Sequence, residues 1–393
     1  MARFGFVLGV LSTAGPLAID MYLPALPSIA RDLHATQGQV EASMMAFFIG
    51  LTVSQPLYGP ISDRIGRRPP IIFGLLLYVA ASLACSFASN VHLLIAGRVL
   101  QGLGAGASIA ISSAIIRDRY TGMQAASLLA LRMLVLGLSP ILAPMMGATL
   151  ISVEPWRSVF WFAACHGLLC AGVMFLIPET RHAEARAGSR LQDAFKVYGR
   201  LSLDRSFMGA VLTLACMQFG FVAYIAGSAF VLMTMNNLSP WFYSVIFSSN
   251  AVGFIGCAQL APRLMRRFKP EQLILFAAMV QTLASLFLLG AALSHHLTVP
   301  VLIGPLFVFL ACFGLVGGPS VVLALRDHAA VAGTASALLS FLQFGSAALG
   351  SGLVAALANG TALPMTGMMA VGACGGLLCA RRAFRPRAVP APV

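Results

Sequence analysis

Long hydrophobic stretches recur along the whole chain, and short polar breaks separate them. A helix needs about 20 mostly apolar residues to cross the hydrocarbon core of a membrane. Twelve of the stretches have about that length, so the pattern predicts an all-α membrane protein with twelve spanning helices. The spans that we expect are 4–26, 38–58, 70–89, 92–115, 124–150, 156–177, 207–232, 240–262, 271–293, 299–325, 331–357 and 363–380.

The longest polar connection follows the sixth span, and it is strongly basic. Its basic residues are Arg181, Arg186, Arg190, Lys196, Arg200 and Arg205. The chain therefore divides into an N-terminal six-helix half, 1–178, a cytoplasmic basic linker, 179–206, and a C-terminal six-helix half, 207–393. A duplicated layout of this kind is typical of membrane transporters that are built from structural repeats.

Lys and Arg are distributed very unevenly between the two sides of the predicted membrane. With a cytoplasmic N-terminus, 21 of the 25 lie on the cytoplasmic side, whereas Arg31 and Arg157 lie on the other side and Arg98 and Arg132 lie inside spans. Cytoplasmic loops carry an excess of basic residues. We therefore predict a multi-pass protein of the bacterial cytoplasmic (inner) membrane with both termini in the cytoplasm. Outside the linker, the cytoplasmic residues are Arg3, Arg64, Arg67, Arg68, Arg117, Arg119, Arg263, Arg266, Arg267, Lys269, Arg326, Arg381, Arg382, Arg385 and Arg387.

The composition agrees with a membrane protein and excludes several other classes. The chain is 59% hydrophobic and 9% charged, whereas a soluble domain carries roughly 25% charged residues. The basic loops explain the net charge of +13, so we expect no nucleic-acid partner. The eight cysteines lie in apolar stretches without a C-x-x-C motif, and the seven histidines form no metal-binding pattern. We therefore expect no metal, no other cofactor and no enzymatic activity, and the absence of a P-loop excludes self-contained ATP drive.

The loop after the second span, 59–68, reads GPISDRIGRR. It resembles the signature of the major facilitator superfamily, which lies between the second and third helices. The resemblance implies the major facilitator fold, in which this cluster is a conformational latch between the two halves. The second half has a degraded copy at 259–268, which is basic but lacks an acid. The latch residues that we expect are Gly59, Asp63, Arg64, Gly66, Arg67, Arg68 and, just after the fourth span, Asp118.

The fourth span contains RVLQGLGAG, 98–106, which is similar to a second motif of the same family. Arg98, Gly102 and Gly106 recur every four residues, so they lie along one stripe of the helix, where the glycines let a neighbour pack closely. An arginine inside a span usually faces a cavity or a partner acid. The alternative is that Arg98 reaches to the membrane interface.

The first span ends with DMYLPALP, 20–27, which resembles the first helix of the bicyclomycin-resistance (Bcr/CflA) and amphenicol exporters. At about 1.5 Å per residue, Asp20 lies about 24 Å from Phe4, and Arg98 lies about 9 Å from His92, so both side chains reach a similar depth. We expect Asp20 and Arg98 to pair directly or through water if their helices adjoin. The alternative is that Asp20 is a helix-end acid in the headgroup region.

The fifth span resembles the antiporter motif of drug exporters, with departures. Its motif residues are Gly137, Pro140, Pro144 and Gly147, whereas Ser139 and Met146 stand where the motif has glycine. Such a pliable helix of small residues suits movement between the halves. The departures weaken the inference of antiport but leave it standing.

These observations together favour proton-coupled efflux of small, largely apolar drugs by alternating access. The partners that we expect are a drug, protons and the lipid bilayer, and we expect a monomer whose energy source is the proton gradient. Asp20 is the first candidate for the coupling acid, and Glu41 is the second. The alternative is a major facilitator transporter of a sugar, an amino acid or an organic anion. The candidate residues of the proton-coupling and substrate cavity are Asp20, Arg98, Glu41, Arg132, Tyr22 and Gln101.

Overall fold

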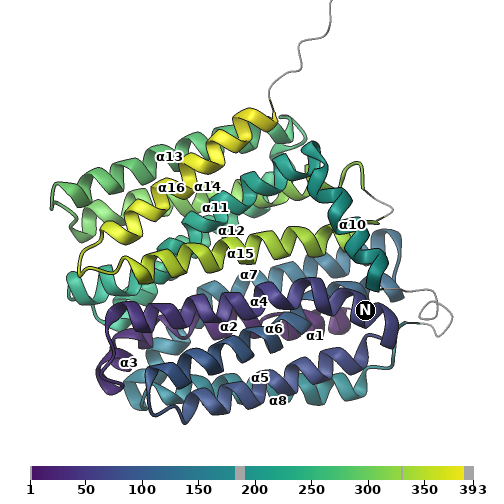
Figure 1. Ribbon diagram of the computed structural model, residues 1–393, viewed down its shortest axis with the longest axis horizontal. Coiled ribbons are helices and arrows are strands. Elements are labelled where there is room, and N and C mark those ends of the chain that lie inside the picture. The colour runs from purple at the N-terminus through teal and green to yellow at the C-terminus, as the bar shows by residue number, and fades with distance from the viewer. Residues whose placement is uncertain (1, 182–190, 329–330, 385–393) are drawn as a thin grey trace, which may run out of the picture.

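The computed structural model describes residues 2–181, 191–328 and 331–384, and these residues form helices and connecting loops without a strand (Figure 1). Eleven single helices are long and apolar enough to cross a membrane, and a bent pair of helices at the start of the chain makes a twelfth span. The number and order of the predicted spans are therefore confirmed. The helices are α1 (Ala2–Ser12), α2 (Ala14–Asp20), the 3₁₀ helix η1 (Leu23–Ala25), α3 (Leu26–Asp32), α4 (Gln37–Ile65), α5 (Arg68–Ser86), α6 (Val91–Arg119), α7 (Gly122–Val153), α8 (Arg157–Leu176), α10 (Leu191–Leu203), α11 (Arg205–Ala229), the π helix η2 (Phe230–Met235), α12 (Pro240–Leu264), α13 (Pro270–Leu293), α14 (Val299–Leu325), α15 (Ala332–Ala356) and α16 (Leu363–Ala383).

The first span is not the continuous helix that the sequence predicts. It bends by 44° between α1 and α2, where the backbone N–H of Thr13 bonds to the carbonyl of Val10, three residues earlier. Pro16 follows directly, and it has no N–H to donate to the carbonyl of Ser12. A second irregularity comes at Pro24, which lies in η1. Two prolines in one short segment thus break the span into pieces.

The helices α4 and α6 extend beyond their predicted ends. α4 continues to Ile65 and α6 to Arg119, so that Asp63 and Asp118 lie on the last helical turns rather than in loops. Gly66 follows the last residue of α4, and its φ of 103° is one that a residue with a side chain rarely adopts. These extensions place Asp63 of the signature loop, and Asp118, on rigid elements.

The basic linker contains a helix, α10, that the sequence analysis did not predict. Tyr198 and Leu201 are buried in an apolar cluster with residues of α11 and α15, whereas Phe195 and Leu203 are 55% and 85% exposed. In Figure 1, α10 runs along one end of the bundle, beside the helices that precede it, α1 to α8, and those that follow it, α11 to α16. Arg186, Arg190, Arg385 and Arg387 of the predicted basic loops lie outside the described residues.

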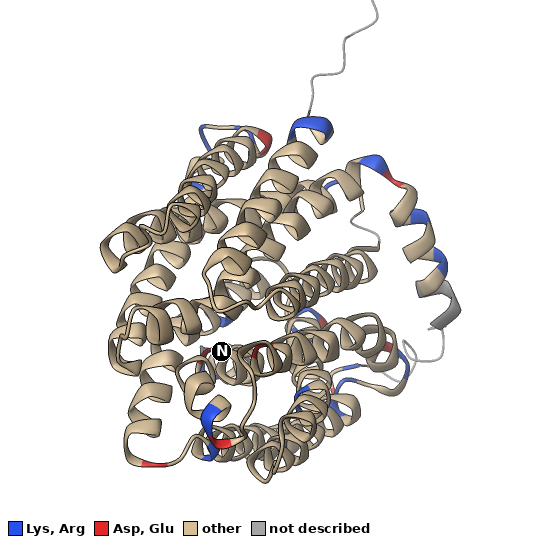
Figure 2. Ribbon diagram, turned by 60° about the vertical axis from the view of Figure 1, so that its left-hand side comes forward, with Lys and Arg blue, Asp and Glu red and all other residues tan. Residues whose placement is uncertain are grey.

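The two ends of the bundle differ in charge, as Figure 2 shows for the helix ends and for α10. We call the end that carries the α4–α5 connection, the α6–α7 connection and α10 the basic end. The opposite end carries Arg31 and Arg157, and Arg157 pairs with Asp32 at 2.5 Å. The predicted asymmetry of the described basic residues is therefore present in the structure.

Candidate functional site

A cavity of about 830 Å³ lies between the first group of helices, α1 to α8, and the second group, α11 to α16. The first group contributes polar and charged lining, including Asp20, Gln55 and Arg132, and the second group contributes Gln218 and Gln343 with several phenylalanines. The lining continues from Asp20 to residues 59–67 and 117–118 at the basic end. The cavity is therefore reached from the basic end.

The two groups of helices are in contact at the opposite end. On α12, the Ser244 hydroxyl donates to the Pro144 carbonyl of α7 at 2.9 Å, and the Ser248 hydroxyl donates to the Ile141 carbonyl at 2.7 Å. α4 packs against α15 there, and a Cβ on Gly38 would strike the carbonyl of Ala355. This packing separates the cavity from a second hollow of about 1590 Å³ at the opposite end.

Asp20 lies in the cavity, where the sequence analysis expected a titratable group. Asp20 is 5% exposed. No described residue gives its carboxyl a hydrogen bond or an ion pair. An acid without a partner, at the meeting of two groups of helices, is free to exchange a proton or to contact a ligand.

Arg98 is fully buried but does not pair with Asp20 and does not line the cavity, in contrast to the expected pair. Its Nη1 donates to the carbonyl of Ala18 at 2.9 Å and to Oε1 of Gln101 at 2.7 Å. Its guanidinium lies 4.5 Å from the ring centroid of Tyr22 and 4.4 Å from that of Phe47, in cation–π geometry. Arg98 therefore ties α2 to α4 and α6 inside the first group of helices.

Tyr22 and Gln101, two further candidates for the cavity, belong to the same buried network around Arg98. The Tyr22 hydroxyl and the Ser43 hydroxyl are 2.6 Å apart, and Gln101 Nε2 donates to the Ser82 hydroxyl at 2.7 Å. Neither lines the cavity, because the cation draws their polar ends towards the interior of the first group.

Glu41, the second candidate acid, lines the hollow at the opposite end rather than the cavity. The residue is 3% exposed, and its Oε1 accepts a bond from Gln37 at 2.8 Å. Among the described residues, Oε2 has no hydrogen-bond partner. The structure thus places Asp20 and Glu41 on hollows that face different ends of the bundle.

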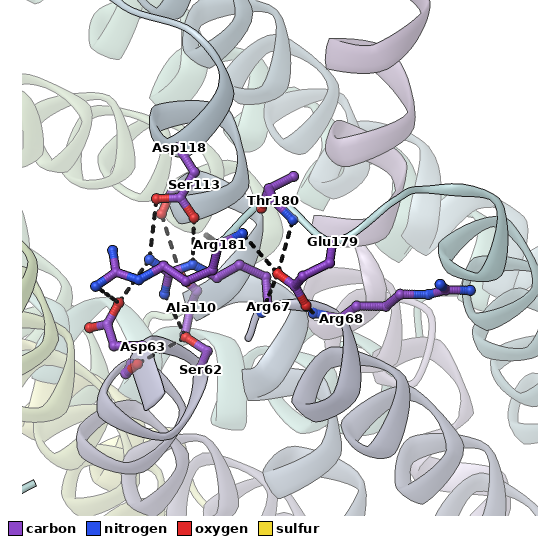
Figure 3. Close-up of polar contacts among 11 residues, drawn as sticks. Ser62, Asp63, Arg67, Arg68, Ala110, Ser113, Asp118, Glu179, Thr180 and Arg181 are labelled. Atoms are coloured by element: carbon purple, nitrogen blue, oxygen red, sulfur yellow. Dashed lines mark hydrogen bonds and ion pairs between the residues drawn. The ribbon is translucent and has the colours of Figure 1, made fainter. Parts of the chain in front are cut away.

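Arg67 is the centre of the cluster at the basic end (Figure 3). Its guanidinium forms ion pairs with Asp63 at 2.8 Å and with Asp118 at 2.7 Å, and Nη1 donates to the Ser62 hydroxyl at 2.7 Å. Asp63 also lies 3.8 Å from Arg181, at the start of the linker. The expected bridge between helix ends is therefore present, and it joins α4 to α6.

The contacts of Arg67 and Arg68 with described residues do not join the two groups of helices, as a latch between the halves would. The described partners of Arg67 and Arg68 lie at residues 62–63, 118, 175 and 179, within the first group or just after it. Gly59 has open space where a Cβ would stand, so it is not a site of close helix packing. Arg64 is exposed, and no described residue forms an ion pair with it.

Glu179 is the residue of this cluster that sequence reasoning missed. Its carboxylate accepts the backbone N–H groups of Arg67 at 2.9 Å, Arg68 at 3.0 Å, Thr180 at 2.9 Å and Arg181 at 2.9 Å. Burial alone would raise the pKa of Glu179, but the bonds from these N–H groups outweigh it and hold the pKa below its ordinary value. The Pro-Glu-Thr sequence after the sixth span was the available signal.

We expect Glu179→Gln to lower the thermal midpoint at pH 7 by about 2–4 °C, because the amide has one acceptor oxygen and no charge. The folded pKa of Glu179 is depressed, so its contribution is complete above the unfolded pKa of about 4.3 and is lost as pH falls through the folded pKa. The difference from the parent should therefore shrink below about pH 4. Thermal unfolding at pH 7 and below about pH 4 measures this difference in the thermal midpoint, with exposed Glu154→Gln as the control. A difference that stays constant with pH would contradict this role.

The fifth-span motif lies at the contact between the two groups of helices. Pro140 lines the cavity, Pro144 accepts the bond from Ser244, and a Cβ on Gly147 would strike the backbone of Met21. Gly137 is looser, since a Cβ there would lie 3.5 Å from Ile255. The motif therefore brings α7 close to both η1 and α12.

Comparison with known proteins agrees with this geometry. The family model of the Major Facilitator Superfamily matches residues 8–351. A Bacillus subtilis protein, the uncharacterised MFS-type transporter YdgK, is 34% identical over 376 residues, which are 95% of this chain and 93% of the relative. The multidrug resistance protein MdtL of Escherichia coli is 30% identical, covering 87% and 86% of the two chains. A bicyclomycin resistance protein homolog of Haemophilus influenzae is 28% identical, covering 94% and 93%.

Solved structures resemble the fold at lower identity. The crystal structure of a D-xylose–proton symporter matches with a TM-score of 0.74 at 15% identity and covers 98% of this chain and 96% of the other. That likeness establishes the arrangement of the helices and nothing about substrate. Because the family model covers most of the chain and the fold agrees, the resemblance that the sequence motifs indicated is confirmed, and this chain is a membrane transporter of the major facilitator superfamily.

Proposed function

We propose that this transporter exports small, largely apolar drugs across the bacterial inner membrane in exchange for protons. The observation that carries the proposal is the unpartnered Asp20 in a cavity between the two groups of helices. Two relatives whose names refer to multidrug and bicyclomycin resistance support a drug as the substrate. No ATP-binding loop or cofactor is needed, since the proton gradient supplies the energy.

The second group of helices offers an apolar aromatic surface to the drug. Phe221 and Phe313 stack with ring centroids 4.6 Å apart, and Phe254 lies 5.6 Å from Phe221 and 5.8 Å from Phe313. The three residues come from α11, α12 and α14, and all line the cavity. Aromatic rings favour flat, apolar ligands, because stacked or tilted ring pairs add to the free energy of apolar burial.

Asp20 is the proposed coupling group. A bound drug and a proton would compete for Asp20, because a hydrogen-bond donor of the drug that contacts the ionised carboxylate favours its charged form. If drug binding promotes proton release, protonation must weaken drug binding by the same factor. Arg98 is a positioning residue, because its hydrogen bond to the carbonyl of Ala18 holds α2, the helix that carries Asp20.

Alternating access requires the halves 1–178 and 207–393 to move relative to each other, with the linker between them. The cavity is reached from the basic end, so the drug must leave through the opposite end. The contacts that would open are those of α12 with α7 and of α15 with α4. Closure of the basic end would bring the Arg67 cluster to the second half, where the family's latch would act.

We further propose that the basic end faces the cytoplasm, because the basic residues gather there. Reporter fusions after Arg205 and at Val393 should be active as cytoplasmic reporters. Periplasmic activity at either point would overturn this orientation.

The test of the function is drug–proton exchange in everted membrane vesicles from a host that lacks its own pumps. A proton gradient with an acidic vesicle lumen should drive accumulation of a drug to which expression of the protein confers resistance. Collapse of the gradient should release the drug. Resistance screening against a drug panel identifies that compound beforehand. Accumulation that does not respond to the gradient would contradict proton coupling.

A transporter of a small metabolite on the same fold is the second candidate. Arg132 favours it, because a cation that faces the cavity without an acidic partner is unusual for a site that takes purely apolar ligands.

A further inference from the structure

We infer that the cavity binds an anionic group, a carboxylate on a flat apolar molecule, at Arg132. The inference rests on the proposed function in that it takes this cavity as the transport site, and it adds a charge requirement to the class of substrate. The observations that carry it are the charge balance of the cavity, the geometry of Arg132 and the aromatic surface of the second half.

The charges that line the cavity do not balance locally. Of its charged lining residues, Asp63, Asp118 and Arg67 pair with one another at the basic end. Asp20, Arg117 and Arg132 remain, and no described residue forms an ion pair with any of them. The cluster carries one excess negative charge, which lies beside Arg117, whereas Arg132 faces the cavity without an ion-pair partner among the described residues, whatever the protonation state of Asp20.

Arg132 is the deeper of these two cations, since the residue is 4% exposed and lies within α7 rather than on its last or first turn. Its Nε donates to the Ser12 hydroxyl at 2.8 Å, and Nη2 donates to the carbonyl of Ile109 at 3.3 Å. These neutral acceptors fix the guanidinium at the break in the first span. No described residue accepts a bond from Nη1, so a donor remains for a ligand.

A buried cation held by neutral groups gains much from an anion. Burying a charge is costly unless it is paired, and the cost falls when a counter-charge arrives. A guanidinium also matches a carboxylate in shape, because its planar donors meet the two oxygens. A carboxylate is therefore the ligand group that this position recognises best.

Arg117 lies on the path to Arg132. It is exposed, lines the same cavity, and belongs to the last turn of α6 at the basic end. Cations that line an opening raise the local concentration of anions and speed their entry. The positive residues thus form a route from the basic end to the buried guanidinium.

The remainder of the ligand would contact the aromatic surface that faces the first half. Phe313 stacks with both Phe221 and Phe254, and all three line the cavity. The first half therefore supplies the charge and the second half supplies the apolar contact. A ligand with a flat ring and one carboxylate can make both the charged and the apolar contact. The corresponding neutral amide can make the apolar contact alone.

The test compares 1-naphthoate with 1-naphthamide, which has the same ring and no charge. Calorimetry with the purified full chain in a non-ionic detergent gives both affinities, with protein-free micelles as the blank. The parent should bind the acid roughly tenfold more tightly than the amide, as expected for a charge-assisted bond. Arg132→Gln should abolish this preference, and Arg132→Lys should keep part of it. Arg266→Gln removes the same charge from an exposed position outside the cavity and should leave the preference unchanged.

Equal affinity of the parent for the two probes, or binding of neither, would overturn the inference without relying on any variant. A full preference in a folded Arg132→Gln protein would overturn it as well. The drug–proton exchange assay separates the two proposals. If the protein exchanges drug for protons but binds 1-naphthoate no better than 1-naphthamide, the anion site is wrong and drug export stands. If it prefers 1-naphthoate but does not exchange drug for protons, the anion site stands and drug export is wrong.

Discussion

Asp20→Asn should abolish drug accumulation driven by a proton gradient. The substitution keeps the size of the side chain and removes its titration, and the described residues offer no other unpaired acid in this cavity. A coupled antiporter needs a group that takes up and releases the proton during each cycle, and such acids are rarely found inside spans without that role. Drug binding should survive, because the aromatic surface that contacts the ring is intact.

The measurement is proton release on adding drug to unbuffered, detergent-solubilised protein, together with accumulation in everted vesicles. The parent should release protons, and Asp20→Asn should release none while still binding the drug. Asp327→Asn is a matched control, because its carboxyl is 63% exposed and lies outside the cavity. Undiminished proton release by Asp20→Asn would show that another acid couples transport. Glu41, on the hollow at the opposite end, would then be the next residue to replace.

Arg67→Ala should destabilise the protein strongly and abolish transport. The arginine side chain is 7% exposed and Asp118 is 15% exposed, so removal of the cation leaves a largely buried carboxylate unpaired. Breaking such a pair from one side costs about 3–5 kcal/mol when both partners are buried. The value here should fall near the lower limit, because the Asp63 side chain is 38% exposed. The ends of α4 and α6 would then separate at the mouth of the cavity.

Thermal unfolding and drug binding of the purified variants distinguish this role from a contact with substrate. Arg67→Ala should unfold at a clearly lower temperature, and its folded fraction should bind drug as the parent does. Adding Asp118→Asn should recover part of the loss, because the unpaired charge is removed; the double-mutant cycle isolates the pair. Arg64→Ala removes an exposed arginine from the same loop and should have little effect. An Arg67→Ala protein as stable as Arg64→Ala would contradict the role of the cluster.

The sequence by itself predicted the number and order of the spans, because a membrane demands about 20 apolar residues for every crossing. It also predicted the charge asymmetry of the two ends. The joining of Asp63 and Arg67 followed from their spacing of four residues, and Asp118 was expected with them because the fourth span ends on the same side of the membrane. The position of Asp20 in a cavity followed from the high cost of burying an acid without a function.

The tertiary structure decided the contacts that depend on rotation about a helix axis and on which helices adjoin. A rise of about 1.5 Å per residue gives depth alone, and depth placed Asp20 and Arg98 at one level without showing that Arg98 faces Tyr22 and Phe47 instead. Glu179 became part of the Arg67 cluster because the sixth span returns to the basic end beside the signature loop. The lack of an acidic partner for Arg132 among the described residues is likewise a result of the tertiary structure. A local sequence pattern does not show which acids lie close to an arginine after folding.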